Sequence, residues 1–354
     1  MNNPINVGLI GFGMAGQTFH APTISCVKGF FLSKIRERKE PNISIIKERY
    51  PTTTIVNDTH QILNDAAIDL VIIATPNTSH HKLATEALNA GKHVVVDKPF
   101  TVTSEEAGEL IELAKKQNKI LTVYHNRRWD SDFKTVQKVI ASGLLGKLAE
   151  CEIHYDRFRN SLRPDTWKED GVPGTGMLYD LGSHLIDQAQ VLFGLPKYVT
   201  AYLRSQREHT RIVDNFEIIF DYGHLKVSLK GGMLVKEPLP RYILLGNNGS
   251  FVKYGLDVQE EHLAAGLKPH QSAAWGEEPE QTWGIINTEF NGIEFRGKVK
   301  SERGNYTGFY QNLCKALKGE EELIVMPSQA KNTIKIIELA RKSNEEKRTV
   351  GFEV

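Results

Sequence analysis

Hydrophobic and polar positions alternate in blocks along the first third of the chain. Short apolar runs occupy residues 6–10, 30–35, 69–74, 94–96 and 121–124. Runs of this kind are typical of strands that are buried on both faces of a parallel sheet. Helical stretches are expected over 17–26, 79–90 and 104–117, with Ser104 as an N-cap and Gly91 as a left-handed C-cap. The alternation of strand and helix predicts a doubly wound parallel sheet.

The rest of the chain has a different pattern. Helices are expected over 133–141 and 182–193, and a final helix over 328–343. The strand-like runs are residues 149–158, 199–203, 215–220, 225–229 and 242–245. The four residues from Asp221 to His224 are typical of a hairpin turn. This pattern predicts a largely antiparallel, open sheet with helices on one face, whereas residues 257–305 are expected to be a long, weakly patterned connection.

Composition narrows the class of protein. The chain has 40% hydrophobic and 25% charged residues and a net charge of +1, which does not favour a nucleic-acid groove or a membrane surface. Its apolar runs are too short for a membrane span, and the N-terminus lacks the pattern of a signal peptide. Three scattered cysteines fit a reducing cytoplasm and give no metal-ligand spacing. We therefore expect a cytoplasmic protein without a metal, a nucleic-acid partner or a membrane partner.

A glycine-rich loop follows the first strand. Its residues are Gly11, Phe12, Gly13, Met14, Ala15 and Gly16. The first glycine of such a loop allows a tight turn, the second lets a pyrophosphate approach, and the third packs the helix on the strand. These six residues are candidate cofactor-binding residues.

Since 354 residues exceed one ordinary core, we predict a Rossmann domain over 1–125 and an α+β domain for substrate binding and oligomerisation over 126–354. The helix 328–343 is expected to pack back on the first domain.

Charged and polar residues stand where two predicted strands end. Asp97 and Lys98 follow the strand 94–96, and Pro99 stops the ladder behind them. Ligands of doubly wound sheets bind beyond the carboxyl ends of the strands, so Lys98 is expected to face a bound dinucleotide. Residues at the end of the preceding strand are Thr75, Pro76, Asn77 and His80, for which an ordinary turn and N-cap is the alternative.

With these motifs and the Asp180/His184 pair, the chain resembles the Gfo/Idh/MocA (glucose–fructose oxidoreductase/inositol dehydrogenase) family over its full length. The motifs are GFGMAG at 11–16, ATPNTSH at 74–80, AGKHVVVDKP at 90–99 and DLGSH at 180–184. Stretches 124–130, 174–184 and 253–260 look most like NADP-linked scyllo-inositol dehydrogenases. The family usually has glutamate where Asp97 stands, which shortens the side chain and retains the charge.

The resemblance implies an NAD(P)-dependent dehydrogenase with Lys98, Asp180 and His184 as catalytic residues that also contact substrate. Asp180 and His184 are four apart at the expected start of a helix, so both project from one face. A histidine is a suitable acid/base near neutral pH, and a carboxylate one turn away can orient it or hold a substrate hydroxyl. Lys98 would hydrogen-bond the reacting oxygen. The alternatives are a capping pair and a structural or solvated lysine.

Other candidates are less specific. Thr75, Pro76, Asn77, His80 and Asp97 line the cofactor in the family. Arg127 follows the last strand of the first domain and Tyr155 lies on the first strand of the second, so both are candidate substrate contacts. Related reductases bring a Trp-Arg pair to the cofactor, and this chain has Trp167-Lys168 in that place. Taken singly, each of these arginines is expected to be solvated: Arg127, Arg128, Arg157, Arg159 and Arg163.

The end of the second strand bears on the cofactor. NAD enzymes place a carboxylate there for the ribose 2′-hydroxyl, and this chain has Arg36, Glu37 and Arg38. Arginine pairs with a 2′-phosphate, so Arg36 and Arg38 favour NADP over NAD. The alternative is that Glu37 holds the ribose and both arginines are solvated.

The leading hypothesis is hydride transfer between NADP and a secondary alcohol of a cyclic polyol or sugar, with scyllo-inositol/inosose as the expected pair. A second is a reductase of another sugar or carbonyl substrate. A third is a sensor that binds dinucleotide without catalysis. The fold alone does not distinguish such a sensor from an enzyme. Open sheets often associate face to face, so a homodimer or homotetramer is expected.

Overall fold

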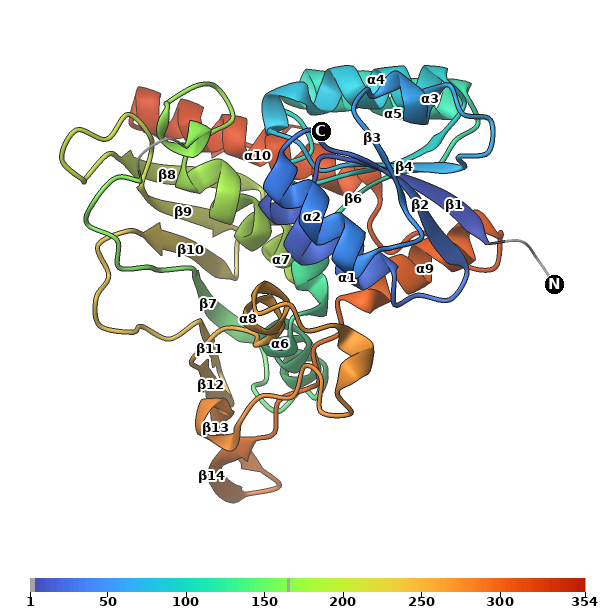
Figure 1. Cartoon of the computed structure of the whole chain (residues 1–354). Coiled ribbons are helices and arrows are strands. Elements are labelled where there is room, and N and C mark those ends of the chain that lie inside the picture. The colour runs from blue at the N-terminus through green and yellow to red at the C-terminus, as the bar shows by residue number, and fades with distance from the viewer. Residues whose placement is uncertain (1–3, 164–165, 354) are drawn as a thin grey trace. The chain divides into compact units, whose positions relative to one another are not determined.

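The computed structural model describes residues 4–163 and 166–353, and the chain divides into two compact units (Figure 1). Unit 1 comprises Met1–Asn126, Gln259–Trp275 and Asn305–Lys331. Unit 2 comprises Arg127–Val258, Gly276–Gly304 and Asn332–Val354. Each unit is assembled from separate stretches of chain, whereas the sequence suggested two continuous ranges.

Unit 1 contains a six-stranded parallel sheet with the order β3-β2-β1-β4-β5-β6. The strands are β1 (Ile5–Ile10), β2 (Phe30–Arg36), β3 (Thr54–Val56), β4 (Leu70–Ile73), β5 (His93–Val96) and β6 (Leu121–Val123). The order reverses between β1 and β4, where doubly wound sheets bind ligands beyond the carboxyl ends of the strands. The predicted Rossmann sheet is confirmed. Only the short strand β3 was not expected.

The helices of unit 1 are α1 (Ala21–Ile24), α2 (Glu40–Arg49), α3 (His60–Leu63), α4 (His80–Asn89), α5 (Ser104–Lys116), α8 (Gln259–Ala264) and α9 (Thr307–Leu317). The stretch expected as one helix over 17–26 is instead a π-helix, Gly16–His20, followed by α1. The N-cap of α5 is Thr103 rather than Ser104, because Thr103 and Glu106 form a reciprocal capping box. Gly91 has the expected left-handed conformation, with φ +71°.

The core of unit 1 explains its uninterrupted apolar runs. All four residues of β4 are buried, and Val94, Val95 and Val96 of β5 are fully inaccessible to solvent. A strand buried on both faces has no position for a polar side chain, so its sequence does not alternate. Asp97 and Lys98 come directly after such a strand, and this places their charges at the sheet's carboxyl edge.

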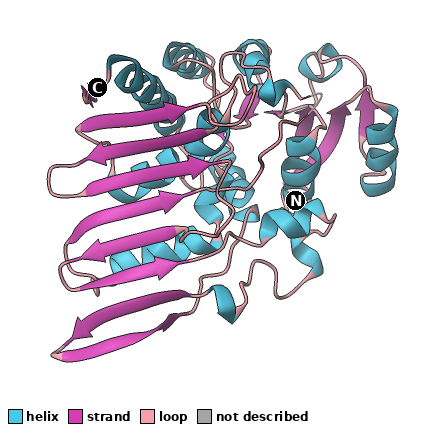
Figure 2. Cartoon of the chain, turned by 90° about the vertical axis from the view of Figure 1, so that its left-hand side faces the viewer, coloured by secondary structure: helices cyan, strands magenta, loops and turns pink. Residues whose placement is uncertain are grey.

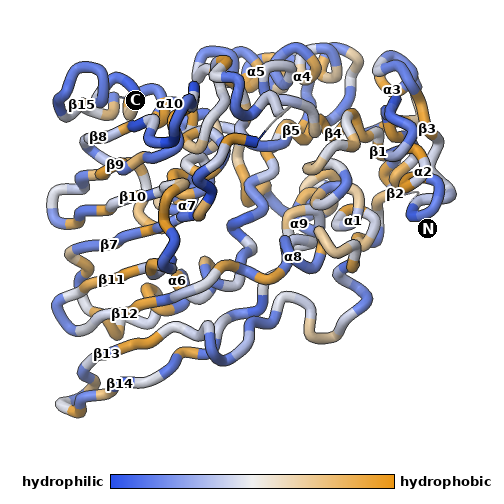
Figure 3. Tube along the Cα trace, turned by 60° about the vertical axis from the view of Figure 1, so that its left-hand side comes forward, coloured by the Kyte–Doolittle hydropathy of each residue, from blue (hydrophilic) through white to orange (hydrophobic). Residues whose placement is uncertain are grey.

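Unit 2 contains a nine-stranded sheet with the order β14-β13-β12-β11-β7-β10-β9-β8-β15. The strands are β7 (Leu148–His154), β8 (Tyr198–Arg204), β9 (Asn215–Asp221), β10 (Lys226–Gly232), β11 (Tyr242–Gly246), β12 (Gly249–Lys253), β13 (Gly284–Phe290), β14 (Ile293–Val299) and β15 (Val350–Gly351). All pairs are antiparallel except β7 and β10. Figure 2 shows the strands side by side, and Figure 3 shows hydrophilic and hydrophobic stretches alternating along them. The predicted largely antiparallel sheet is confirmed.

The helices of unit 2 are α6 (Ser131–Ala141), α7 (Ser183–Phe193) and most of α10 (Pro327–Glu346). From Asn332 onward α10 belongs to unit 2, where Ser343 and Asn344 accept backbone N–H groups of β8. The hairpin expected at Asp221 is present between β9 and β10. The expectation for residues 257–305 was wrong, since they include α8 and the β13–β14 hairpin.

Candidate functional site

The glycine loop of unit 1 provides a cradle for a phosphate. Gly11 has φ +100°, and a Cβ placed there would lie 2.5 Å from the carbonyl oxygen of Ala74. A Cβ on Gly16 would lie 2.2 Å from the carbonyl oxygen of Gly11. Gly13 differs, because a Cβ there meets nothing within 4 Å. The fold itself therefore requires the first and third glycines, whereas the second leaves open space in which a dinucleotide pyrophosphate fits.

The other residues of this loop lie in contrasting environments. Phe12 is 1% exposed and its ring packs edge-on against Tyr50, so this residue forms part of the core. Met14 is 57% exposed. The carbonyl oxygen of Phe12 accepts a hydrogen bond of 3.2 Å from the Asn42 amide, which ties the loop to the start of α2.

The carboxylate that follows β2, on Glu37, already accepts hydrogen bonds from its own turn. Oε1 of Glu37 accepts the backbone N–H groups of Arg38 and Lys39, at 2.7 Å and 2.9 Å, and Oε2 accepts the Asn42 amide at 2.7 Å. Burial tends to raise the pKa of Glu37, but these hydrogen bonds and the charge of Arg36 outweigh it and hold the pKa below its ordinary value. Glu37 thus acts as an internal brace of this turn.

The two arginines beside Glu37 are differently placed. Arg36 is half-buried, and its Nε is shielded from solvent without a hydrogen-bond partner in the part of the chain that the structure describes. Arg38 is exposed, and its Nε donates to the carbonyl oxygen of Asn57 at 2.9 Å. A pocket lined by Glu37, Arg38, Ile43, Asn57 and Asp58 lies at this end of the sheet.

The residues after β4 form a turn that His80 braces. The hydroxyls of Thr75 and Ser79 lie 2.7 Å apart, and Pro76 precedes a 3₁₀ turn, Asn77–Ser79. His80 is 1% exposed, and its two ring nitrogens lie 2.9 Å from the carbonyl oxygens of Pro99 and Thr75. Burial lowers the pKa of His80, although Asp97 opposes this. The imidazole therefore links this turn to the segment after β5, and it has little surface left for a ligand.

The segment after β5 positions Asp97 and Lys98. The Asp97 N–H donates to the Ile73 carbonyl oxygen at 2.8 Å, which extends the β4–β5 pairing by one residue. The Lys98–Pro99 peptide is cis, and Lys98 is half-buried. Asp97 faces a buried histidine, His20, whose Nε2 lies 3.5 Å from Oδ1. Sequence reasoning missed His20, although its place four residues after Gly16 puts it one turn from the loop.

In unit 2, Asp180 and His184 lie at a junction between two kinds of helix. Asp180 is part of a π-helix, Leu178–Gly182, and His184 lies in the first turn of α7. The sequence suggested a single α-helix here, and the wider π-turn changes the spacing between the two side chains. The Asp180 side chain is 33% exposed, whereas His184 is 4% exposed.

Sequence reasoning also missed a partner of Asp180. The Lys168 ammonium lies 3.4 Å from both carboxylate oxygens of Asp180. Lys168 is part of a 3₁₀ turn, Trp167–Glu169, and the Trp167 side chain is 36% exposed. The sequence contained a hint of this contact: Lys168 stands where related reductases have an arginine, so the position carries a cation in both.

Arg127 and Arg128, at the start of unit 2, are buried, so the expectation of solvated side chains was wrong for both, whereas Arg163 is exposed. Arg127 is 6% exposed and pairs with Asp130 at 3.3 Å. Its guanidinium lies 5.1 Å from the ring centre of Tyr155, which is 1% exposed. Arg128 is 7% exposed and forms a bidentate ion pair with Asp187 at 2.8 Å and 2.6 Å.

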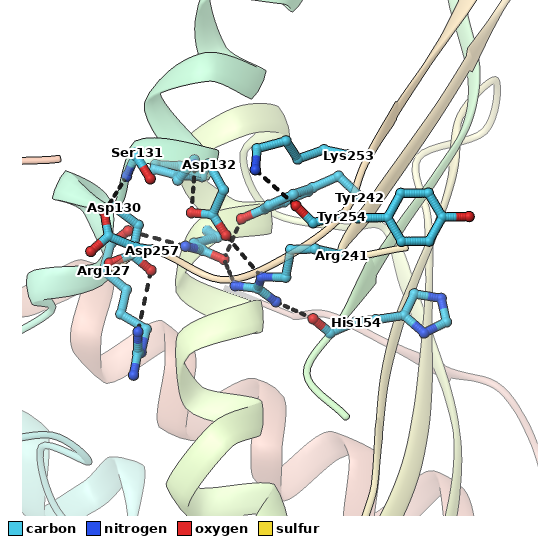
Figure 4. A network of polar contacts seen from close by, with 12 residues as sticks. Arg127, Asp130, Ser131, Asp132, His154, Arg241, Tyr242, Lys253, Tyr254 and Asp257 are labelled. Carbon is cyan, nitrogen blue, oxygen red and sulfur yellow. Dashed lines mark hydrogen bonds and ion pairs between the residues drawn. The ribbon is translucent and has the colours of Figure 1, made fainter. Parts of the chain in front are cut away.

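A buried polar network fixes α7 on the sheet (Figure 4). Arg241 is its centre, and its guanidinium contacts Asp132, the carbonyl oxygen of His154 and Oε1 of Gln188. The Tyr242 hydroxyl donates to the same Gln188 oxygen at 2.9 Å. Gln188 lies one turn after His184 on α7, so this network determines where the candidate acid/base stands.

Two features of the structure, one in each unit, define a class of protein. Unit 1 has the doubly wound sheet and the glycine loop that are typical of dinucleotide-binding proteins, and unit 2 carries Asp180 and His184. Across residues 4–163 and 166–353, no group of three or more metal-ligating side chains is found, and no helix has the length and hydrophobicity of a membrane span.

Both units match descriptions of one family. Residues 5–125 match the Gfo/Idh/MocA oxidoreductase family, NAD-binding Rossmann fold, and residues 137–352 match its C-terminal alpha/beta domain. The chain therefore belongs to the Gfo/Idh/MocA oxidoreductase family. It is an NAD(P)-dependent dehydrogenase of this family, a class that acts on CH–OH groups.

Individual relatives are similar over the whole chain. The uncharacterized oxidoreductase YdgJ of Escherichia coli is 43% identical, with 99% of each chain covered. The scyllo-inositol 2-dehydrogenase (NADP(+)) IolW of Bacillus subtilis is 38% identical, with 99% of this chain and 96% of IolW covered. The solved structure of YvaA from Bacillus subtilis superposes with a TM-score of 0.94 at 38% identity, and covers 99% of both chains.

Proposed function

We propose that this chain is an NADP-dependent cyclic-polyol dehydrogenase that oxidises scyllo-inositol and reduces the corresponding inosose. The observation that carries the proposal is its full-length similarity, at 38% identity, to a scyllo-inositol 2-dehydrogenase (NADP(+)). A polar set of candidate residues, Lys98, Asp180 and His184, suits a substrate with several hydroxyls better than an apolar ligand.

The end of β2 supports NADP over NAD. The Glu37 carboxylate accepts three hydrogen bonds from its own turn, so a ribose 2′-hydroxyl would have to compete for it. Arg36 has a shielded Nε that makes no hydrogen bond to the described residues, and Arg38 is exposed beside it. Guanidinium groups pair with phosphate bidentately, so both arginines suit a 2′-phosphate.

Cofactor choice is tested by dissociation constants for NADP and NAD measured by calorimetry. Arg36→Ala is expected to weaken NADP binding by about 10-fold or more, the loss of one charged hydrogen bond, and to leave NAD binding nearly unchanged. Arg296→Ala, which removes an exposed arginine of β14, is the control. Tighter binding of NAD than of NADP, unaffected by Arg36→Ala, would contradict the assignment.

The proposed chemistry divides among three side chains. A bound nicotinamide cofactor would supply the acceptor for the hydride that leaves the carbon of the alcohol. His184 takes the hydroxyl proton, and Asp180 orients His184 or holds a neighbouring hydroxyl. Lys98 hydrogen-bonds the reacting oxygen and stabilises its developing negative charge. The Lys168 ammonium, 3.4 Å from both carboxylate oxygens of Asp180, helps to hold that carboxylate in place.

The substrate is tested by a cofactor-reduction screen over inositol isomers and common aldoses, with NADP and NAD in separate series. We expect NADP-dependent oxidation of scyllo- or myo-inositol and faster reduction of the inosose. Turnover of acidic sugars alone would overturn the polyol assignment and leave the dehydrogenase class intact. Tight cofactor binding without turnover of any compound would instead favour a sensor.

The proposal includes a homodimer or homotetramer in the cytoplasm. Large apolar side chains are exposed along strands of the unit 2 sheet, among them Tyr198, Tyr202, Phe290, Ile293 and Phe295. Exposed apolar residues gathered on a sheet are typical of a protein interface. Light scattering after gel filtration measures the mass, and Ile293→Lys is expected to shift it toward the monomer. A monomeric unmodified chain would refute the assembly.

A further inference from the structure

A chain of three polar side chains, two of them fully buried, leads to the end of β5 in unit 1. The hydroxyl of Tyr310, on α9, is 2.6 Å from Nδ1 of His20, and Nε2 of His20 is 3.5 Å from Oδ1 of Asp97. Tyr310 and His20 are fully buried, and the Asp97 side chain is 15% exposed. The chain ends at the residue directly before Lys98.

In the contacts that join Tyr310, His20 and Asp97, the donor and the acceptor can be assigned. Burial raises the pKa of Tyr310 well above its ordinary value, so the hydroxyl keeps its proton and can donate to Nδ1. A neutral imidazole that accepts at Nδ1 has its own proton on Nε2, and a charged imidazolium has one there as well. In either form His20 presents an N–H to Asp97.

The contact between His20 and Asp97 is longer than an ordinary hydrogen bond. Within the described part of the chain, Nε2 of His20 is buried and forms no other hydrogen bond. Hydrogen bonds of functional groups are often long in ligand-free structures and shorten in complexes.

The position of the imidazole is fixed by its surroundings. The ring lies 4.2 Å from the ring of Tyr124, centre to centre, and 6.3 Å from that of Tyr310. The residue that carries it is the last of the π-helix Gly16–His20, directly before α1, and His20 is one of the buried residues of this π-helix. His20 thus has little freedom to turn away from Asp97.

Asp97 is surrounded by groups that favour its charged form. Burial acts to raise the pKa of Asp97, but the His20 N–H and the charges that His20, Lys98 and His80 can carry outweigh it, so the pKa lies below its ordinary value. An ionised carboxylate therefore stands beside Lys98.

We propose that His20 and Tyr310 are positioning residues that hold the Asp97 carboxylate in place, and that Asp97 in turn orients the Lys98 ammonium. This inference rests on the proposed function, in which Lys98 hydrogen-bonds the reacting oxygen. An aromatic core gains no stability from a buried polar chain over apolar side chains of similar size, because buried polar groups are costly to desolvate. A role at Lys98 accounts for its presence.

The test measures Lys98 itself, without substrate or cofactor. The rate at which an amine-reactive reagent labels Lys98 is followed against pH by peptide mass spectrometry. We expect Asp97→Asn to change the rate at which Lys98 is labelled by about 2- to 10-fold, since the carboxylate that holds the ammonium in place is lost. We expect His20→Gln and Tyr310→Phe to change the labelling curve as well.

The decisive comparison is a double-mutant cycle. In the Asp97→Asn background, His20→Gln should have no further effect on Lys98 labelling, because its effect passes through the carboxylate. An effect of His20→Gln that persists undiminished in that background would overturn the proposal. If His20→Gln does not fold, Tyr310→Phe, which removes one hydroxyl, serves in the same cycle.

Tyr124→Phe is the matched control. Its hydroxyl lies in the same core and contacts Thr23 at 3.4 Å, so its removal leaves the chain to Asp97 intact. Lys98 labelling should follow the unmodified protein, and a change as large as that of Tyr310→Phe would contradict the proposal. In a polyol assay, Tyr310→Phe should lower kcat by about 3- to 10-fold with an unchanged dissociation constant for NADP. Absence of polyol turnover would refute the proposed function and leave the labelling cycle interpretable.

Discussion

Two substitutions in the glycine loop distinguish a glycine that the fold requires from a glycine that cofactor binding requires. Gly16→Ala places a Cβ 2.2 Å from the carbonyl oxygen of Gly11, whereas Gly13→Ala places one where nothing lies within 4 Å. A carbon and a carbonyl oxygen in van der Waals contact are normally about 3.2 Å or more apart, so Gly16→Ala forces the turn to open by about 1 Å. Overpacking of this kind costs about 1–3 kcal/mol.

We therefore expect Gly16→Ala to lower the stability of the fold and Gly13→Ala to weaken cofactor binding. For Gly16→Ala we expect a fall in Tm of roughly 2–8 °C. For Gly13→Ala, whose φ is not in the left-handed region, we expect a stability change of less than about 1 kcal/mol. Its methyl group occupies the space in which a pyrophosphate fits, so NADP binding should weaken by at least about 10-fold, which corresponds to about 1.4 kcal/mol.

The measurements are thermal unfolding by circular dichroism and NADPH titration by fluorescence. Gly351→Ala is the control, because a Cβ there also meets nothing within 4 Å. It should change neither Tm nor the dissociation constant. If Gly13→Ala binds NADPH as tightly as the unmodified chain, the cradle is not a phosphate site, and if Gly16→Ala keeps its Tm, the steric argument fails.

Three further predictions follow from the candidate site. Lys98→Met and His184→Ala should each lower kcat by roughly 10² or more with nearly unchanged cofactor binding, and Asp180→Asn should impair both turnover and substrate affinity; near-normal activity of Lys98→Met in steady-state assays would leave Lys98 with a structural role only. Glu37 has a depressed pKa in the folded state, so its stabilising effect is present above its unfolded pKa of about 4.3 and is lost as the pH falls through the folded value. Glu37→Gln should thus lower the urea midpoint at pH 7 and not in strong acid, and an equal loss at both pH values would contradict this. Arg128→Met leaves the Asp187 carboxylate buried without its bidentate partner and should cost about 3–5 kcal/mol, whereas Arg128→Met/Asp187→Leu should recover most of that loss in urea unfolding; a double variant as unstable as the single one would refute the argument.

The sequence alone was sufficient for features that depend on near neighbours in the chain. The apolar runs of β4 and β5 predicted buried parallel strands, because a strand covered on both faces has no polar position. The glycine loop and the β9–β10 hairpin were also recognisable, since a tight turn restricts its residues locally. The family resemblance followed from the same motifs, and it is confirmed by matches to both halves of the chain.

Other features depend on residues that are distant in the chain, and only the tertiary structure reveals them. His20 contacts Tyr310 across 290 positions, and no periodicity in a sequence marks such a pair. Lys168 meets Asp180 only because a π-helix and a 3₁₀ turn bring them together, and neither form has a strong sequence pattern. Arg128 looks like a surface cation until Asp187 of α7 is placed against it. A charged side chain can be buried only where the fold supplies its partner, and the fold is decided by the packing of the whole unit.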